Sequence, residues 1–173
     1  MSELTEAEKG YLAGMMDADG CISIASGTHT KGYPIHSLRS IITSSDKSYL
    51  EYWRDKLDMG AVHKQTGRPI RGSNRRRVWY SWQLGPNDTV ALLRLIGDHL
   101  ILKRDQAKVA LAFMELPSGC FGSRGVPAGI IEKREAFCGL IRDLKHEEMV
   151  SDDEIEAVIL DIIGAKQEPL WAD

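Results

Sequence analysis

The sequence lacks several features that mark whole classes of protein. No stretch approaches the roughly 18 consecutive apolar residues of a membrane-spanning helix, and the first residues lack the basic and apolar regions of a signal peptide. The three cysteines, Cys21, Cys120 and Cys138, are too few and too far apart for a disulfide framework, and no Cys-x-x-Cys pair indicates zinc. We therefore expect an intracellular protein in a reducing compartment, with no membrane partner. The choice between an organelle and a prokaryotic cytoplasm stays open.

The 173 residues, 43% of them hydrophobic, are enough to bury one core. The net charge of −3 conceals an uneven distribution. Between residues 61 and 104, nine Lys and Arg side chains stand against two acids, whereas between 145 and 173 nine acids stand against two lysines. A basic segment of this kind indicates an anionic partner where it lies on one surface, although a solvated face is an equally good interpretation.

Capping residues and hydrophobic periodicity predict where the helices and strands lie. Thr5 and Glu8 form a capping box for a first helix that ends at Gly20, and Ser45 is expected to cap a later helix over 46–57, after which Gly60 closes the element. Alternation of apolar and polar residues predicts the strands. After the first helix, the predicted elements are strands 21–30 and 35–44, helix 46–57, strands 61–65 and 77–84, and helices 88–96, 104–116, 130–146 and 152–163.

This order of elements predicts an α+β fold. Its core would be αββαββα, with a four-stranded antiparallel sheet, helices on one face and extra C-terminal helices. We expect the core to occupy residues 1–117, and the loop and helical extension of 118–173 to pack on the same domain. The face of the sheet without helices would then be free to bind a ligand.

Residues 11–20, YLAGMMDADG, end the first helix with two carboxylates. Ala13 and Gly14 let another backbone approach closely, so the helix is suited to packing against a second copy of itself. Asp17 and Asp19 are two residues apart and cannot share one face of a helix. Two packed helices would bring two Asp19 carboxylates together, which favours a hard cation such as Mg²⁺ between them. For an arbitrary Asp-x-Asp-Gly, a solvated helix end would be the better interpretation.

The nine residues from Leu12 to Gly20, LAGMMDADG, resemble the motif of the LAGLIDADG homing endonucleases and depart from it only at Met15 and Met16. The resemblance extends over the order of elements to about Leu116. It implies a site-specific endonuclease that makes a double-strand break in a long pseudopalindromic DNA target by metal-dependent phosphodiester hydrolysis, encoded within an intron or an intein. Because only one motif is present, it also implies a homodimer. The expected dimer contacts on the motif helix are Leu12, Ala13, Gly14, Met16 and Asp17.

The resemblance also implies roles for individual residues. Asp19 is expected to bind the catalytic Mg²⁺, which Mn²⁺ or Ca²⁺ can replace in a crystal, together with the main-chain carbonyl of Ala18. Lys103 is expected to stabilise charge or activate water at the scissile phosphate. Asp46 occupies the place of a polar residue that organises water, although the family favours glutamine there. A basic residue expected shortly afterwards is missing, which leaves that function to Lys47 or vacant.

The sheet is expected to contact double-stranded DNA. Two-stranded ribbons fit the major groove, so outward-facing residues would read base edges while Arg and Lys bind phosphates. Each such residue, taken singly, is more often a plain surface residue. The expected DNA contacts are Ser23, Ala25, His29, Lys31, Arg39, Thr43, His63, Gln65, Arg68, Arg71, Arg75, Arg76 and Arg77. Residues 78–82 carry aromatic side chains at both odd and even positions, so the face of the sheet on which each of them lies is not assigned. By default, Trp79, Tyr80 and Trp82 are expected in the core.

Two other functions fit the same fold. One is an intron maturase, an RNA-binding splicing cofactor, and the other is a DNA-binding regulator that does not cut. Asp19 together with Lys103 favours the nuclease, because neither binding role requires a metal-binding carboxylate. A maturase would be free to retain both residues.

Overall fold

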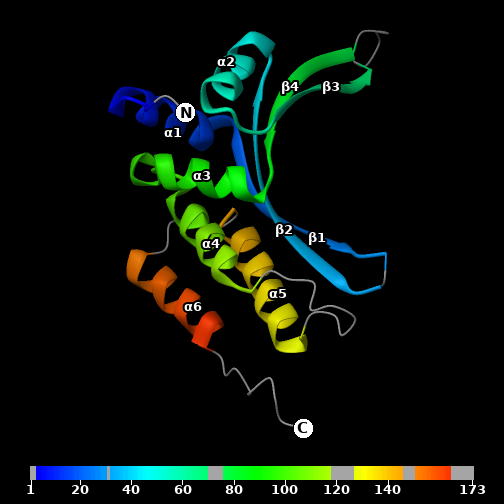
Figure 1. Ribbon diagram of the computed structural model, residues 1–173, viewed down its shortest axis with the longest axis vertical. Coiled ribbons are helices and arrows are strands. Elements are labelled where there is room, and N and C mark those ends of the chain that lie inside the picture. Colours follow the sequence, from blue (N-terminus) through cyan, green and yellow to red (C-terminus); the bar gives the residue numbers. More distant parts are fainter. Residues whose placement is uncertain (1–2, 31, 70–75, 118–126, 146–150, 165–173) are drawn as a thin grey trace. The chain divides into compact units, whose positions relative to one another are not determined.

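The structure, a computed structural model, describes residues 3–30, 32–69, 76–117, 127–145 and 151–164. It confirms the predicted α+β class with a four-stranded sheet (Figure 1). No helix among these residues is both long enough and apolar enough to span a membrane. In chain order the elements are α1 (Glu6–Asp19), β1 (Gly20–Thr28), β2 (Pro34–Ser44), α2 (Lys47–Leu57), β3 (Ala61–Pro69), β4 (Arg76–Leu84), α3 (Pro86–Ile96), η1 (Gly97–His99), α4 (Arg104–Glu115), α5 (Ala128–Asp143) and α6 (Asp152–Gly164).

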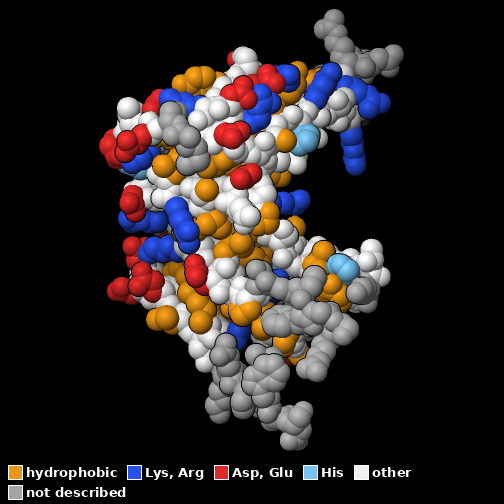
Figure 2. Space-filling model, in the orientation of Figure 1, with side chains coloured by type: hydrophobic (Ala, Val, Ile, Leu, Met, Phe, Trp, Pro, Cys, Tyr) orange, Lys and Arg blue, Asp and Glu red, His pale blue; other side chains and the backbone are white. Residues whose placement is uncertain are grey.

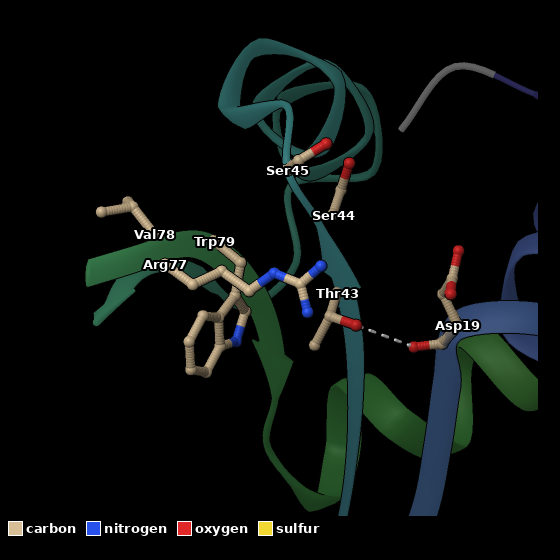
Figure 3. Close-up of a pocket in the computed structure, with 7 residues that line it drawn as sticks. All are labelled: Asp19, Thr43, Ser44, Ser45, Arg77, Val78 and Trp79. Carbon is tan, nitrogen blue, oxygen red and sulfur yellow. Dashed lines mark hydrogen bonds between the residues drawn. The ribbon is translucent and has the colours of Figure 1, made fainter. Parts of the chain in front are cut away.

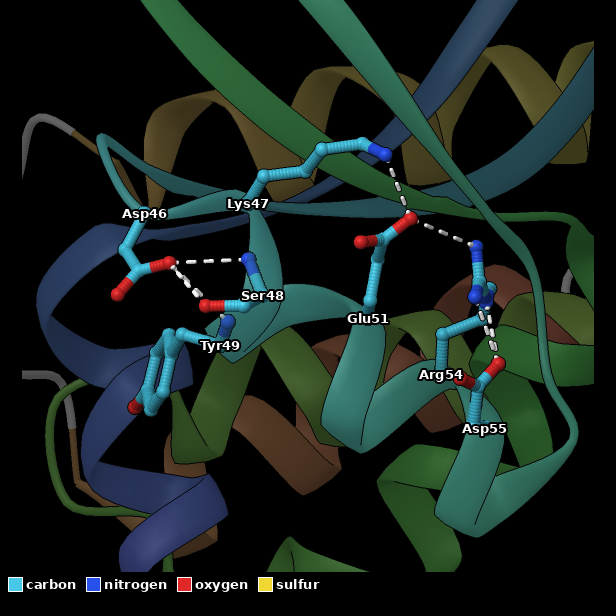
Figure 4. Close-up of polar contacts among 7 residues, drawn as sticks. All are labelled: Asp46, Lys47, Ser48, Tyr49, Glu51, Arg54 and Asp55. Atoms are coloured by element: carbon cyan, nitrogen blue, oxygen red, sulfur yellow. Dashed lines mark hydrogen bonds and ion pairs between the residues drawn. The ribbon is translucent and has the colours of Figure 1, made fainter.

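Capping side chains set the starts of the first two helices. The predicted capping box of α1 is confirmed, because the Glu8 amide donates to Thr5 Oγ1 at 3.3 Å and the Thr5 amide donates to Glu8 Oε2 at 3.0 Å. The prediction that Ser45 caps α2 is wrong. Asp46 is the cap, since its Oδ1 accepts from the amides of Ser48 at 2.9 Å and Tyr49 at 3.4 Å (Figure 4).

The sheet has the strand order β1-β2-β4-β3, and β4 pairs antiparallel with both β2 and β3. Trp82 lies opposite Ile42 on β2 and Val62 on β3. Its side chain is completely buried and its Nε1 donates to the main-chain oxygen of Met59 at 2.8 Å. Because successive side chains of a strand alternate between faces, Ser81 points to the opposite face.

The chain forms two compact units. Unit 1 comprises Met1–Ile22 and Arg39–Arg104, and unit 2 comprises Ser23–Leu38 and Asp105–Asp173. Strands β1 and β2 continue from one unit into the other, so neither unit is a single stretch of chain. The predicted boundary at 117/118 falls at the edge of the described residues and stays a prediction.

In unit 1, helices α1, α2 and α3 lie on the same side of the strands (Figure 1). Their apolar faces fill the core together with Trp82. A pair of hydroxyls is buried there as well: Ser40 Oγ lies 3.1 Å from Thr89 Oγ1, which also donates to the Leu84 carbonyl at 3.3 Å. The hydrophobic helix residues of this core that have no exposed area are Leu12, Ala13, Met16, Leu50, Leu92, Leu93 and Ile96.

In unit 2, helices α4, α5 and α6 carry the core. Phe113 of α4 packs edge-on against Phe137 of α5, with ring centroids 6.2 Å apart. Acidic side chains near the start of α6 pair with α4, because Lys108 Nζ lies 3.1 Å from Asp152 and 3.5 Å from Glu156. Helix α6, the described part of the acidic C-terminal segment, thus packs on the helices of its own unit.

Candidate functional site

A pocket of about 550 Å³ lies in unit 1 where α1 ends (Figure 3). The exposed carboxylate of Asp19 stands on one side of it, and the guanidinium of Arg77 reaches in from β4 toward Thr43. The Thr43 hydroxyl donates to the main-chain oxygen of Asp19 at 3.3 Å, which fixes the helix end against β2. The residues that line the pocket are Asp19, Thr43, Ser44, Ser45, Arg77, Val78 and Trp79.

Gly20 holds Asp19 at this position. The chain leaves the helix at Gly20 in an extended conformation, while the Gly20 amide still donates to the Met16 carbonyl. A Cβ at residue 20 would lie 2.4 Å from that carbonyl oxygen, closer than real Cβ contacts allow. The last residue of the motif is therefore glycine because the helix backbone approaches it closely.

The other motif acid, Asp17, is bound within the chain and does not line the pocket. Its carboxylate accepts from the amides of Ile101 at 2.8 Å and Lys103 at 2.9 Å. The Lys103 ammonium donates to the main-chain oxygen of Asp17. This places a positive charge at the C-terminal end of α1, where the helix dipole favours it. Lys103 is also outside the pocket lining.

The predicted dimer contacts on the motif helix need correction. Leu12, Ala13 and Met16 have no exposed area, so they pack inside unit 1 and cannot meet a second chain. Asp17 is half-buried and bound as described. Gly14 is exposed, as a contact residue must be. Three other small residues lie on the same exposed face of α1, and their helical spacing is visible in the sequence. They are Ala7, Gly10 and Ala18.

Asp46 serves α2 in the structure. Besides the two amides, the Ser48 hydroxyl donates to Asp46 Oδ1 at 2.6 Å. These hydrogen bonds, led by that of the Ser48 side chain, hold the pKa of Asp46 below its ordinary value. Lys47 pairs with Glu51 at 2.8 Å (Figure 4). Neither residue lines the pocket, and a role for Asp46 in organising water stays a prediction.

The predicted DNA contacts of unit 1 are accessible, and two of them, Thr43 and Arg77, meet Asp19 in the pocket. Figure 2 shows Lys and Arg side chains gathered over the β3–β4 hairpin. Contact with DNA stays a prediction for all of these residues. The exposed ones are Arg39, His63, Arg68, Arg76 and Arg77, while Thr43 and Gln65 are half-buried.

In unit 2, Ser23 and Ala25 are half-buried on the face of β1 opposite the buried Ile22 and Ile24, as the alternation predicts. His29 follows the end of β1 and stacks on a neighbouring tyrosine with ring centroids 4.4 Å apart. Three further predicted contacts, Lys31, Arg71 and Arg75, lie outside the described residues.

Trp79 is a pocket residue that the sequence analysis assigned to the core. Its indole covers Gly67 on β3, where an added Cβ would lie 3.0 Å from the ring. Tyr80 is half-buried, and only Trp82 of the three aromatics is fully buried. The register of β4 against both neighbouring strands determines which of these aromatic side chains is buried, because it places Trp82 between Ile42 and Val62.

The described residues contain no group of three or more His, Cys, Asp and Glu side chains that could hold a metal ion by themselves. The pocket offers one carboxylate, from Asp19, and several neutral oxygens. This donor set resembles an open cation site that needs further ligands from outside the chain.

No protein-family model matches the sequence, and comparison with curated proteins gives no match. Solved structures do match. The homing endonuclease I-CvuI, crystallised on I-CreI target DNA with 2 mM Mg and uncleaved DNA, gives a TM-score of 0.62 at 16% identity over 91% of this chain and 95% of that one.

Two further structures agree with this result. The archaeal intron-encoded homing endonuclease I-Vdi141I, complexed with DNA, gives a TM-score of 0.61 at 15% identity, over 91% of this chain and 98% of that one. The LAGLIDADG homing endonuclease I-SmaMI, bound to cleaved DNA, gives 0.54 at 13% identity, over 93% of this chain but only 49% of that one. At such identities the similarity establishes the fold.

Proposed function

We propose that this chain, which has the fold of the LAGLIDADG homing endonucleases, is a site-specific DNA endonuclease. In this proposal a homodimer makes a double-strand break in a pseudopalindromic duplex by Mg²⁺-dependent phosphodiester hydrolysis. The enzyme would act in a reducing intracellular compartment. The match to DNA-bound endonucleases supports the class of partner, and the pocket supports the chemistry.

The observation that carries the proposal is that Asp19 and Arg77 line the same pocket. A guanidinium matches the geometry of a phosphate and binds it through two parallel hydrogen bonds. A carboxylate repels a phosphate unless a cation stands between them. One pocket that holds both groups therefore fits a phosphodiester together with a divalent cation.

The residues present fit Mg²⁺. Asp19 and the Ala18 carbonyl would hold it, because this ion takes oxygen ligands and usually combines one or two carboxylates with water and substrate phosphates. When bound, Mg²⁺ would polarise the phosphoryl group and lower the pKa of water. Arg77 would bind a non-bridging phosphate oxygen, and Lys103 would add positive charge near the end of α1. Thr43 would keep Asp19 aimed into the pocket.

The dimer is supported by three features. Each chain brings one pocket carboxylate, whereas a double-strand break requires hydrolysis of two phosphodiesters. The exposed face of α1 carries Gly10 and Gly14, where an added Cβ would meet nothing within 4 Å, so a second backbone can approach. The structural match covers 95% of the I-CvuI chain but only 49% of the I-SmaMI chain, so one copy of this chain corresponds to about half of the longer protein. A two-fold pair would read a pseudopalindrome, one half-site per subunit.

The test is a cleavage selection on a randomised pseudopalindromic duplex library with Mg²⁺. Wild type would run beside Asp19→Asn and beside Asp153→Asn, a matched change at an exposed position of α6. We expect wild type and Asp153→Asn to enrich the same cut sequences with two-fold symmetry, and Asp19→Asn to cut nothing. Cutting by Asp19→Asn would refute the assignment of this residue. Duplex preference without cutting would indicate a regulator, and preference for structured RNA would indicate a maturase.

A further inference from the structure

Two glutamine side chains share one serine hydroxyl on the sheet of unit 1. The Nε2 of Gln65 on β3 donates to Ser81 Oγ at 3.1 Å, and the Nε2 of Gln83 on β4 donates to the same oxygen at 3.1 Å. Ser81 is only 3% exposed, while both glutamines are half-buried. The hydroxyl is thus covered by the two amides that it holds.

This Gln65–Ser81–Gln83 network lies on the same face of the sheet as the pocket. Ser81 is paired with Thr43 on β2 and with His63 on β3, and Gln65 is paired with Trp79. Thr43 and Trp79 line the pocket that holds Asp19. Because side chains alternate along a strand, this face is the one opposite Trp82 and the helices of unit 1. A duplex bound at the pocket would therefore pass over the two glutamines.

The hydrogen bonds to Ser81 determine what the glutamines can offer. A primary amide has two N–H donors and one carbonyl acceptor. Once one N–H is given to Ser81, each amide keeps one donor and one acceptor. In the major groove, adenine presents the complementary pair, an N7 acceptor and an N6 donor. Guanine presents two acceptors, and cytosine and thymine each present a single polar group.

We propose that Ser81 is a positioning residue that aims the Gln65 and Gln83 amides at two adenines in each half-site. Ser81 does not touch the DNA itself. By holding both amides in the orientation that adenine requires, it lowers the conformational cost of binding. This inference rests on the proposed function, because it names part of the target that the dimer reads.

The first experiment is a binding selection on a randomised duplex library without divalent metal, so that binding is scored and cleavage is not. Wild type should enrich adenine at two positions of each half-site. Ser81→Ala frees both amides and should reduce the adenine preference at both positions by about 5-fold or more, within the range for a bidentate pair. Thr66→Ala is the matched control on β3, since it removes an exposed hydroxyl next to Gln65 on the opposite face. It should leave the preference unchanged.

A second variant gives a reading that loss of folding cannot imitate. Gln83→Glu leaves only acceptors, which suit the N4 amino group of cytosine. We expect one position per half-site to change from adenine to cytosine by roughly 5-fold to 150-fold, while the position read by Gln65 keeps adenine.

Two outcomes would overturn the inference in distinguishable ways. If wild type selects a duplex but Ser81→Ala and Gln83→Glu both keep its base preferences, the glutamine network does not read bases and the proposed function survives. If folded wild type, judged by a cooperative thermal transition, prefers no duplex at all, the proposed function fails and the inference fails with it.

Discussion

Lys103 binds Asp17 through both its main chain and its side chain. The Lys103 amide donates to the Asp17 carboxylate at 2.9 Å, and its ammonium donates to the Asp17 carbonyl. The same carboxylate takes the amide of Ile101 at 2.8 Å. Asp17 therefore holds the segment before α4 against the end of α1, two residues before Asp19, which lines the pocket.

Asp17→Asn should destabilise the protein. An amide side chain offers one acceptor oxygen where the carboxylate offers two, so one of the two backbone amides loses its partner. The free energy of unfolding should fall by about 1–2 kcal/mol, the cost of leaving a partly buried donor unsatisfied. Urea unfolding measures the difference, with Asp98→Asn at an exposed position as the control. Equal stability of the two variants would show that these hydrogen bonds do not matter.

Lys103→Met keeps most of the side-chain stem and removes the charge. If Lys103 acts at the phosphate, the variant should bind its duplex normally but cut it at least 10-fold more slowly, an effect of about 1.4 kcal/mol on the barrier. Single-turnover cleavage and duplex binding, both measured on folded protein, separate the two roles. A normal cleavage rate together with a lower unfolding temperature would show that the Lys103 ammonium serves stability, through its hydrogen bond to the Asp17 carbonyl, and not cleavage.

Asp46 can be tested with two substitutions that separate capping from catalysis. Asparagine caps a helix about as well as aspartate, whereas alanine does not cap. Asp46→Asn should keep the thermal stability of wild type, and Asp46→Ala should lose some of it because the Ser48 and Tyr49 amides lose their acceptor. If the negative charge of Asp46 is also what organises water, cleavage will fall in both variants. Cleavage that follows stability alone would argue against that role.

In the proposed homodimer, Gly14→Leu should separate the subunits without destabilising either one. An added Cβ at Gly14 meets nothing within 4 Å, and leucine favours a helix over glycine by nearly 1 kcal/mol. We expect sedimentation to show a folded monomer that no longer makes double-strand breaks. Lys47→Leu introduces the same side chain at an exposed position of α2 and should stay dimeric. A dimer of unchanged affinity in Gly14→Leu would place the interface elsewhere.

The contribution of Glu8 to stability should depend on pH. A hydrogen bond from the Lys56 ammonium, followed by that from the Thr5 amide, lowers the pKa of Glu8 from 4.5. A carboxyl whose pKa is lowered by folding stabilises the protein above its unfolded pKa and loses this effect as the pH falls through its folded pKa. Glu8→Gln should therefore unfold at a lower temperature than wild type at about pH 7, and the difference should shrink as the pH falls below 4.5 and through the lowered pKa of folded Glu8. A constant difference would show that the charge is not involved.

Helices and strands could be predicted where a periodic pattern coincides with a cap or a glycine. The capping box at Thr5 and the close approach at Gly20 bound α1 as expected. The start of α2 was misassigned because Ser45 and Asp46 are adjacent and both can cap, and only the backbone decides which side chain reaches the first amides. Strand β3 was predicted too short, since Gly67 and Arg68 break the alternation although the chain continues to pair with β4.

The site could be predicted in part. Asp19, Thr43 and Arg77 were each named from the motif, the alternation or the charge, and the structure brings them together. Trp79 was wrongly expected in the core, because residues 78–82 carry bulky side chains at both odd and even positions and the face on which each lies depends on pairing with distant strands. The dimer contacts on the motif helix could not be predicted from the sequence either, because the apolar residues that suit a dimer contact are buried in the chain's own core.

The division of the chain into two interleaved units bears on how such a protein can change over generations. Each unit is assembled from two separated stretches, with transitions after Ile22, Leu38 and Arg104. A single recombination crossover, wherever it falls, joins parts of one unit that come from different parents. Combining an intact unit from each of two parents requires three crossovers, one at each transition, so point substitution is the easier route to a changed surface.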